Sequence, residues 1–374
     1  MNDLTTVIED RGPRWEVKLL LDQMAVSGLA VVKKQMQVGP VSVKMGGIAG
    51  VWTPADHRKK GYASRAMWDG IALMEKEGCD MSILFGIADF YHRYGFAVAF
   101  AEQSMTLSTQ ALQKLSGPYR GRTSKPADLL AIRRLYRRYN AGRSGMDVRV
   151  GNWLPRWYMP RLGEGTTRRA GQVVVVCDGQ DRVRGYAVYD AQAERMVVAE
   201  VCGADHKALM SIGGVLARRA LRAKVEHIRF CLPVDDPFVH LCVPLGCEVR
   251  AGYPFNSGAM GRIVRLNSLI KKMIPVFEDR VKKSQLTWRG VLGIETDIGR
   301  VGLRIGPSGV AMSSPSAHTR IKVNQMVLTQ LVMGYRGVFD VLHDRGVDIP
   351  KQILPVVDVL FPRGNPYMWW TDRF

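Results

Sequence analysis

The chain has 374 residues, enough for two or three domains at roughly 150 residues each. Hydrophobic residues make up 47% and charged residues 23% of it, an ordinary globular balance that excludes a disordered or fibrous chain. No apolar run approaches the roughly 18 residues of a membrane span, and the opening MNDLTTVIED carries acids where a signal peptide has basic residues. We therefore expect a cytoplasmic protein with no membrane partner.

The net charge of +19 is unevenly distributed along the chain. Residues 1–104 contain 12 basic and 12 acidic residues, whereas residues 105–262 contain 25 and 13, and residues 263–374 contain 16 and 9. The excess positive charge therefore belongs to the last two thirds of the chain. It fits either an anionic partner or a basic, soluble surface.

The six cysteines are scattered, with no CxxC pair and no histidine at ligand spacing. We expect buried free thiols, and neither a disulfide framework nor a metal site. The motifs HExxH and GxSxG are absent, so metalloprotease and serine-hydrolase chemistry have no support in the sequence.

Residues 15–53 predict three strands, WEVKLLLD, LAVVKKQMQV and VSVKMGGIAGVWT, separated by turns at 24–28 and at Gly39-Pro40. Residues 65–78 then show the apolar spacing of a helix. Its core-facing positions are Ala66, Met67, Gly70, Ile71 and Met74.

The loop between the third strand and this helix is basic and contains Gly61. Such a loop suits a pyrophosphate, because the first N–H groups of a helix are free and the helix dipole favours an anion there. Gly61 allows close approach of the backbone, and the preceding Arg58, Lys59 and Lys60 add positive charge. Taken alone, the loop fits a solvated basic turn better than a phosphate site.

A second motif follows about 30 residues later. MSILFG (81–86) predicts a short strand, and Phe90-Tyr91-His92-Arg93-Tyr94-Gly95-Phe96 comes after it. Together the two motifs resemble the GNAT superfamily of acetyl-CoA-dependent N-acetyltransferases. That superfamily pairs an R/Q-x-x-G-x-G/A loop, here Arg58 to Ala63, with a later FYxRxGF segment.

The middle of the chain repeats this pattern more loosely. Residues 173–191 predict a hairpin around Asp-Gly-Gln-Asp, residues 197–205 a strand, residues 208–223 a helix and residues 227–233 a further strand. The order resembles a second, degenerate acetyltransferase fold. It lacks the R-x-x-G-x-G/A loop, so we expect it to bind no coenzyme.

After residue 263 the sequence predicts alternating strands in LTWRGVLGIET, GRVGLRIG and GVAMSS, and an apolar helix over 322–336. With the FYxRxGF segment, the pair Arg149-x-x-x-Trp153, the run LTQLVMGYR and the ending LFP…P…W…D-x-F, the chain resembles the enhanced intracellular survival (Eis) acetyltransferase family. In that family a GNAT domain, a second GNAT-like domain and a sterol-carrier fold follow one another.

The expected fold class is therefore α+β. Tandem GNAT folds, each a mixed central sheet flanked by helices, precede a sterol-carrier-like α/β domain. We expect a catalytic acetyl-CoA-binding domain at 1–104, a degenerate GNAT-like domain at 105–262, and a sterol-carrier-like domain at 263–374 that delivers the C-terminal carboxylate.

The resemblance also implies the roles of particular residues. It makes the terminal carboxylate of Phe374 the general base and Tyr91 the general acid, with acetyl-CoA as co-substrate and no metal. The pantetheine arm is expected along Gly50, Val51, Trp52 and Thr53, beside an opening flanked by Gly86 and Ile87. The pyrophosphate is expected at Arg58, Lys59, Lys60, Gly61, Tyr62, Ala63 and Ser64.

These assignments agree with elementary chemistry. A carboxylate is ionised at neutral pH and can take a proton from an arriving ammonium group, and a phenol can protonate the leaving thiolate. An aromatic core position is the alternative for Tyr91, and a frayed chain end is the alternative for Phe374. Against fraying, the last eight residues include Tyr367, Trp369 and Trp370.

The acceptor is expected to be a primary amine of a small molecule, a peptide or a protein lysine. Some members of the family acetylate aminoglycosides, but a strongly positive protein repels polycations unless its pocket is locally acidic. The resemblance further implies a homo-oligomer, and hexamers are common in the family.

A function from another class remains open, namely nucleic-acid binding or modification through the basic second and third domains. Its best feature is one predicted helix with Arg133, Arg134, Arg137 and Arg138 at four-residue spacing and Tyr136 and Tyr139 between them. A solvated basic helix face explains the same pattern. Lipid binding by the C-terminal domain is a third alternative, although the apolar residues 325–333 also fit a core helix.

Overall fold

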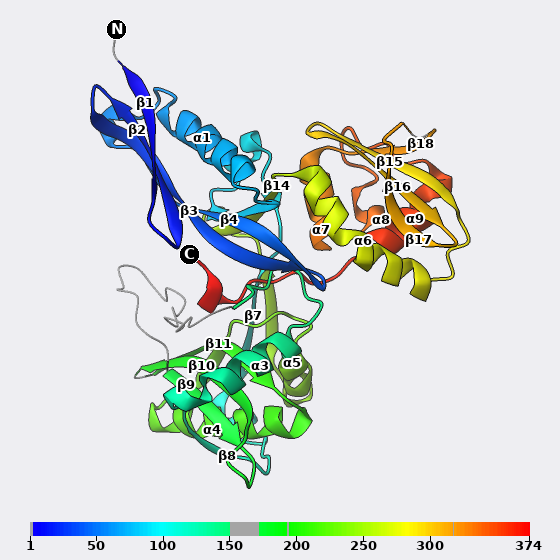
Figure 1. The fold of residues 1–374 in the computed structure, drawn as a ribbon. Helices are drawn as coiled ribbons and strands as arrows, with labels where there is room; N and C mark the ends of the chain where they lie inside the picture. The colour runs from blue at the N-terminus through cyan, green and yellow to red at the C-terminus, as the bar shows by residue number, and fades with distance from the viewer. Residues whose placement is uncertain (1–2, 150–171, 193, 317) are drawn as a thin grey trace.

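The computed structural model describes residues 3–149, 172–192, 194–316 and 318–374. In Figure 1 the N-terminal strands and the C-terminal part form two neighbouring units, and the middle of the chain forms a third below them. Trp153, which carries part of the resemblance to the Eis family, lies outside the described residues.

Seven strands form the first sheet, in the order β1-β2-β3-β4-β5-β14-β6. They are β1 (Leu4–Asp10), β2 (Arg14–Leu21), β3 (Met24–Val38), β4 (Val41–Trp52), β5 (Met81–Gly86), β14 (Gly258–Ile263) and β6 (Ala97–Val98). Only β4 and β5 run parallel, and α1 (Tyr62–Lys76) makes the crossover that parallel neighbours need. The five α1 residues predicted to face the core are all buried, so the helical spacing predicted this element correctly.

The first hairpins differ from the expectation. The turn predicted at 24–28 lies instead at Asp22 and Gln23, whose φ angles of 48° and 70° are the pair of positive values that a tight hairpin turn requires. Residues 4–10, where no strand was predicted, form β1 against β2. Asp-Gln lacks the glycine that usually marks such a turn, which is why the sequence pattern misplaced it.

The middle of the chain forms a second seven-stranded sheet, in the order β13-β7-β12-β11-β10-β9-β8. Its strands are β7 (Glu102–Ser108), β8 (Arg120–Thr123), β9 (Gln172–Cys177), β10 (Val183–Gln192), β11 (Arg195–Gly203), β12 (His227–Phe230) and β13 (Glu248–Gly252). Its helices are α2 (Thr109–Leu112), α3 (Leu129–Tyr139), α4 (His206–Arg222) and α5 (Pro237–Cys242). The predicted hairpin, helix and final strand correspond to β9 with β10, to α4 and to β12.

Two strands link the first and second units in a way that sequence order does not suggest. β14 follows the second sheet along the chain, yet it pairs with β5 and β6 in the first sheet. β7 directly follows the first sheet's β6 region and pairs with β12 and β13 in the second. The first sheet therefore draws a strand from well beyond residue 104.

The C-terminal part contains a four-stranded sheet in the order β17-β16-β15-β18. Its elements are α6 (Leu266–Lys283), β15 (Gly290–Thr296), β16 (Gly299–Gly306), β17 (Gly309–Ser313), β18 (Thr319–Lys322), α7 (Gln325–Met333), α8 (Val338–Val341) and α9 (Leu354–Leu360). Most of α7 is buried, as a core helix requires. None of the helices in the described part of the chain is long and apolar enough to cross a membrane.

The first and third units share one hydrophobic core. Met45 of β4 and Ile83 of β5 belong to the same buried cluster as Leu269 and Met273 of α6. The buried Asp80 strengthens this junction, because its carboxylate accepts hydrogen bonds from the Lys44 backbone N–H at 2.9 Å and the Ser268 hydroxyl at 2.6 Å.

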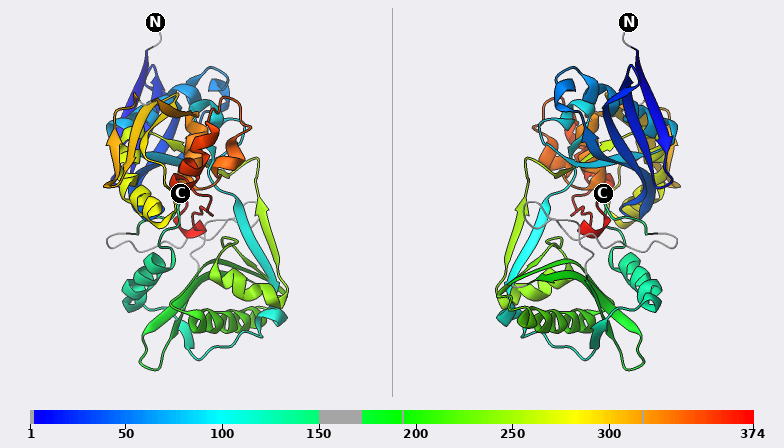
Figure 2. Two further views of the ribbon diagram at one scale, coloured as in Figure 1. Left: turned by 90° about the vertical axis from the view of Figure 1, so that its right-hand side faces the viewer. Right: turned by 90° about the vertical axis from the view of Figure 1, so that its left-hand side faces the viewer.

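The last residues of the chain leave the third unit and pass between the other two, and both views in Figure 2 place the C-terminus there. Tyr367 and Trp369 belong to the core of the second unit, whereas Phe374 packs against the core shared by the first and third. The apolar chain end is therefore packed inside the molecule.

Candidate active site

The central feature of the first sheet is the separation of its two parallel strands. β4 and β5 pair from Met45 opposite Met81 to Ile48 opposite Leu84, and no further. Beyond that point β4 continues beside β3 to Trp52, while Phe85 and Gly86 of β5 pair with β14. An opening therefore lies between the carboxyl ends of two neighbouring strands.

A β-bulge lies on the β4 side of this opening. The register between β3 and β4 shifts between the pairs Ala30–Ala49 and Gly28–Trp52, so Gly50 and Val51 together oppose one residue of β3. Gly50 has a φ of 56°, and a Cβ built on it meets no atom within 4 Å. The bulge thus turns backbone groups out of the ladder beside open space.

Two side chains fix the end of β4. The Ser27 hydroxyl bonds the Trp52 carbonyl at 3.0 Å and lies 2.9 Å from the Thr53 hydroxyl oxygen. Trp52 is 40% exposed, and its indole lies against Gly28, where a Cβ would sit 2.9 Å from the indole nitrogen. Gly28 therefore makes room for the tryptophan ring.

The basic loop leads from β4 into α1. Gly61 is the N-cap of the helix, with a φ of 83°, and Lys59 also has a positive φ, at 61°. The side chains of Arg58, Lys59 and Lys60 are exposed, and a Cβ on Gly61 meets nothing within 4 Å. Free helix N–H groups, positive charge and open space thus coincide where the sequence predicted a pyrophosphate.

Tyr91 lies on one side of the separated strands. It begins a short 3-10 turn (Tyr91–Tyr94), and its ring packs so close to Gly86 that any Cβ there would collide with it. The ring also contacts Phe90, with centroids 4.9 Å apart. Burial, with a smaller contribution from Tyr94, raises the pKa of the Tyr91 phenol, so the hydroxyl stays protonated at neutral pH.

Phe374 lies on the other side. Its ring centroid is 5.8 Å from that of Phe85, and a Cβ on Gly47 would collide with it. Phe85 and Gly86 are consecutive in β5, so they point to opposite faces of the sheet. The rings of Tyr91 and Phe374 therefore flank the opening from opposite faces.

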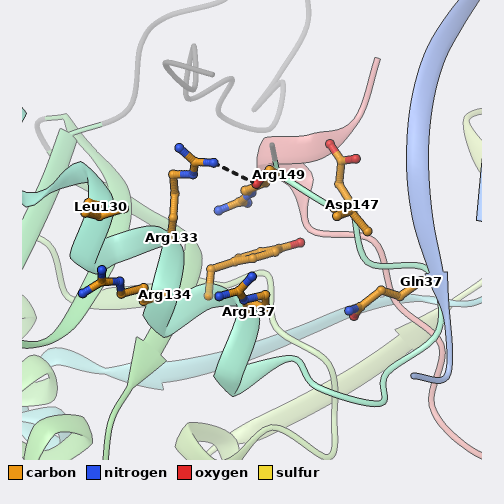
Figure 3. A pocket seen from close by; sticks show the side chains of 9 residues that line it. Gln37, Leu130, Arg133, Arg134, Arg137, Asp147 and Arg149 are labelled. Carbon is orange, nitrogen blue, oxygen red and sulfur yellow. Dashed lines mark hydrogen bonds between the residues drawn. The ribbon is translucent and has the colours of Figure 1, made fainter. Parts of the chain in front are cut away.

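A cavity of about 410 Å³ lies near the chain end, between β3, α3 and the segment 147–149. Figure 3 shows the side chains of Arg133, Arg134 and Arg137 around it, with Asp147 and Gln37 on the opposite wall. Lys34 joins the cavity wall to the chain end, because its ammonium group is 2.6 Å from the Asp147 carboxylate and 5.8 Å from the centre of the Phe374 ring.

The tyrosines of α3 are not available for stacking on bases. Tyr136 is 3% exposed, and its hydroxyl donates a hydrogen bond to the Asp372 carboxylate at 2.9 Å. Tyr139 donates to the buried Asp236 at 2.6 Å. The predicted basic face is also divided, since Arg138 donates to the carbonyl of Ala204 at 2.6 Å, away from the cavity.

One cluster near the site was missed from the sequence. Arg149, Glu200 and Asp372 form a buried charge network. Glu200 interrupts the apolar run VVAEVC of β11, and an acid in a buried strand requires a partner. That signal could have indicated the network but not which residues complete it.

Two regions of the chain match known protein families. Residues 16–99 match a family described as "Acetyltransferase (GNAT) domain", and residues 145–263 match a second family with the same description. No curated protein matches the chain.

Solved structures resemble the whole chain. A probable N-acyltransferase of unknown function from Enterococcus faecalis V583 has a TM-score of 0.79 and 18% identity, with 97% of this chain and 90% of that one covered. A GCN5-related N-acetyltransferase from Kribbella flavida has a TM-score of 0.75 and 17% identity, covering 96% and 87%. Eis1 from Mycobacterium abscessus has a TM-score of 0.66 and 16% identity, covering 98% and 92%.

The fold and the sequence matches thus define a protein with two GNAT acetyltransferase domains. The chain is an N-acetyltransferase.

Proposed function

We propose that the protein transfers the acetyl group of acetyl-CoA directly to a primary amine, with Tyr91 as general acid and the C-terminal carboxylate of Phe374 as general base. The observation that carries the proposal is the position of the Tyr91 and Phe374 rings on opposite faces of the opening between β4 and β5. Acetyl transfer to an ammonium group needs a proton acceptor and a proton donor near the reacting atoms, and the opening is where we expect those atoms.

The coenzyme would lie along the bulged end of β4, from Gly50 to Thr53, with its pyrophosphate at the loop from Arg58 to Ser64. Open space beside Gly50 and Gly61 and exposed basic side chains support this placement. Gly86 and Ile87 would flank the opening, since they lie beyond Leu84, the last residue of β5 that pairs with β4. No metal is needed for the transfer.

The reaction balances as follows. The ammonium group of the acceptor gives one proton to the Phe374 carboxylate, directly or through water, and the freed nitrogen lone pair attacks the thioester carbonyl. The C–S bond breaks, its electron pair stays on sulfur, and Tyr91 protonates the thiolate. The nitrogen loses a second proton, which restores Tyr91, and the Phe374 carboxyl group releases the first proton to water. The products are an amide, free coenzyme A and one proton.

The charges near the chain end favour an acceptor with few positive charges. The carboxylates of Asp147, Asp372 and Glu102 are already paired with Lys34, Arg149 and Arg373. They leave little negative potential for a polycation, and the neighbouring cavity is lined by arginines. A small amine, a peptide or a protein lysine therefore fits better than an aminoglycoside.

The remaining parts are proposed as a scaffold. Residues 1–104 would supply the catalytic domain, residues 105–262 a GNAT-like domain without coenzyme, and residues 263–374 a sterol-carrier-like domain that brings the chain end to the site. The shared core of the first and third units supports this arrangement, as does the buried α7. We also propose a homo-oligomer, on the resemblance to the Eis family.

The test is release of the coenzyme A thiol from acetyl-CoA across a panel of aminoglycosides, polyamines, lysine peptides, amino acids and tRNA. We expect release with one class of amine, and its loss in a chain that lacks Phe374. Full activity of that shortened chain would contradict the role of the carboxylate. Binding of tRNA that weakens steeply with salt, without thiol release, would favour the nucleic-acid function instead.

A further inference from the structure

The second unit repeats the strand arrangement of the active site. β11 and β12 run parallel and pair only from Met196 opposite Ile228 to Val198 opposite Phe230. β11 then continues to Gly203 beside β10, so the two strands separate as β4 and β5 do. The second GNAT domain therefore has an opening of its own at the equivalent place.

The helix after this opening is unsuited to a pyrophosphate. Asp205 is the N-cap of α4, and its carboxylate accepts a hydrogen bond from the Ala208 backbone N–H at 2.8 Å. Asp205 also pairs with Arg184, at 2.8 Å. A fixed negative charge thus occupies the helix terminus that would otherwise attract an anion.

The C-terminal segment lies at the second opening. The Tyr367 hydroxyl donates to the carbonyl of Cys231, the residue that follows β12, at 2.8 Å. The Thr371 hydroxyl donates to Glu200 on the separated part of β11, at 2.5 Å. The chain's own end therefore occupies the region that corresponds to a substrate cleft.

Arg149 holds the segment there. Its guanidinium bonds both oxygens of Glu200, at 2.9 and 2.7 Å, and both oxygens of Asp372, at 2.9 and 3.0 Å. The three side chains are at most 2% exposed. Burial alone would lower the pKa of Arg149, but the charges of Asp372 and Glu200 raise it well above its ordinary value, so the guanidinium stays charged. We call Arg149, Glu200 and Asp372 the clamp.

Hydroxyl groups complete the clamp. Tyr136 donates to Asp372 at 2.9 Å, and its ring lies 3.6 Å below the Arg149 guanidinium. Tyr186 donates to Glu200. Because each carboxylate has several donors, Asp372 has one well-defined position, and a two-residue slip of the chain end would leave buried charges unpaired.

Asp372 is two residues from the chain end, so its position limits that of the terminal carboxylate. Arg373 is extended, and two extended residues span about 7 Å. Arg373 adds a second attachment through Glu102, at 2.9 Å, and stacks 4.0 Å from the Trp370 ring. Phe374 then reaches Phe85 on β5.

We propose that the second GNAT domain is a binding site for the C-terminal segment, and that Arg149, Glu200 and Asp372 are positioning residues that hold the Phe374 carboxylate at the active site of the first domain. The inference rests on the proposed function of Phe374 as general base. It assigns to the domain without coenzyme a specific part in the reaction of the other.

The first test compares Asp372→Asn and Glu200→Gln with the wild type, with Asp128→Asn as matched control. Asp128 forms a bidentate ion pair with Arg122 in the same domain, at 2.6 and 2.9 Å, and this pair does not contact the chain end. We expect the clamp variants to lose at least about tenfold in kcat with an acceptor that arrives protonated, while the KM for acetyl-CoA and the rate of the control stay within about twofold.

A neutral acceptor distinguishes a misplaced Phe374 carboxylate from a general folding defect. A hydrazide is uncharged at neutral pH and needs no base, so the clamp variants should acetylate it at nearly the wild-type rate. The chain without Phe374 should behave in the same way. An equal loss of rate with the hydrazide and with the protonated amine would overturn the proposal, because it would indicate a folding defect.

A second measurement does not depend on activity. Carboxypeptidase A removes a C-terminal phenylalanine that it can reach, so we expect slow release of Phe374 from the wild type and the Asp128→Asn control, and release at least about tenfold faster from Asp372→Asn. Equal release from all three would overturn the clamp. If the clamp variants are fully active while the chain without Phe374 is inactive, only the clamp is wrong; if the shortened chain is fully active, the proposed base is wrong.

Discussion

The ring of Phe374 lies against the Cα of Gly47, at a point where any Cβ would collide with it. Gly47 lies in the part of β4 that pairs with β5, one residue before Ile48, the last paired residue. The absence of a side chain at this position is what admits the end of the chain to the sheet.

We therefore expect Gly47→Ala to displace Phe374 and to lower kcat by about tenfold or more, with acetyl-CoA binding retained. Gly46→Ala is the control, since its Cβ would point to the other face of the sheet, toward the flexible side chain of Met74. Steady-state kinetics and calorimetric binding of acetyl-CoA would check this. A Gly47→Ala enzyme with wild-type kcat would show that Phe374 tolerates displacement.

Tyr91→Phe is expected to lower kcat by about 100-fold, because it removes the proton donor and keeps the ring against Gly86. Burial raises the pKa of Tyr91 above its ordinary value of about 10, so the wild-type rate should not decline on the alkaline side until the pH exceeds that value. A pH–rate profile of both proteins tests the assignment. An alkaline limb near pH 8 that disappears in Tyr91→Phe would contradict the direction of the shift.

Gly61→Asp is expected to weaken acetyl-CoA binding by at least about tenfold, which is about 1.4 kcal/mol. Gly61 has a φ of 83°, and an acid there adds negative charge beside the expected pyrophosphate. Gly346→Asp is a matched control in the third unit, with a φ of 80° and the same open surroundings. A side chain at a positive φ should lower the free energy of unfolding of both variants by about 1–2 kcal/mol. A difference in acetyl-CoA affinity between the two variants is therefore the informative result.

Asp236→Asn is expected to change how stability depends on pH. Burial raises the pKa of Asp236 to about 7, against an ordinary value of about 3.9. Between these values the unfolded chain loses a proton that the folded chain keeps, so the group's contribution to the free energy of unfolding falls as pH rises, and it is constant above about pH 7.

The asparagine cannot ionise, and it can still cap α5 and accept the Tyr139 hydroxyl. Its stability relative to the wild type should therefore increase by about 2–4 kcal/mol between pH 4 and pH 7. Urea unfolding at several pH values would measure this difference. Parallel pH curves for the two proteins would contradict it.

The sequence predicted those parts of the fold that depend on local patterns. The spacing of Ala66, Met67, Gly70, Ile71 and Met74 predicted α1, because a period near 3.6 residues fixes one buried face. The Asp-Gly-Gln-Asp turn predicted the β9–β10 hairpin, because those residues favour a tight turn.

The sequence predicted less wherever distant residues meet. The pairing of β14 with β5 joins strands far apart along the chain, and nothing in MSILFG or GAMGRI specifies the partner. The clamp could not be predicted for the same reason. Glu200 in an apolar strand indicated a buried partner, but only the folded chain brings Arg149 and Asp372 to it. The Tyr91 and Phe374 assignments came from family resemblance and stay predictions until the variants are measured.

The insertion of β14 has a consequence for synthesis. Until Gly258–Ile263 leaves the ribosome, β5 lacks one of its two neighbours, and the nascent first sheet exposes an unpaired edge at that strand while residues 99–257 are being translated. The second sheet can form during that interval, since its strands all lie between Glu102 and Gly252. The first sheet, although its synthesis begins first, is therefore completed after the second sheet. A fragment ending at residue 104 would be prone to aggregate rather than fold.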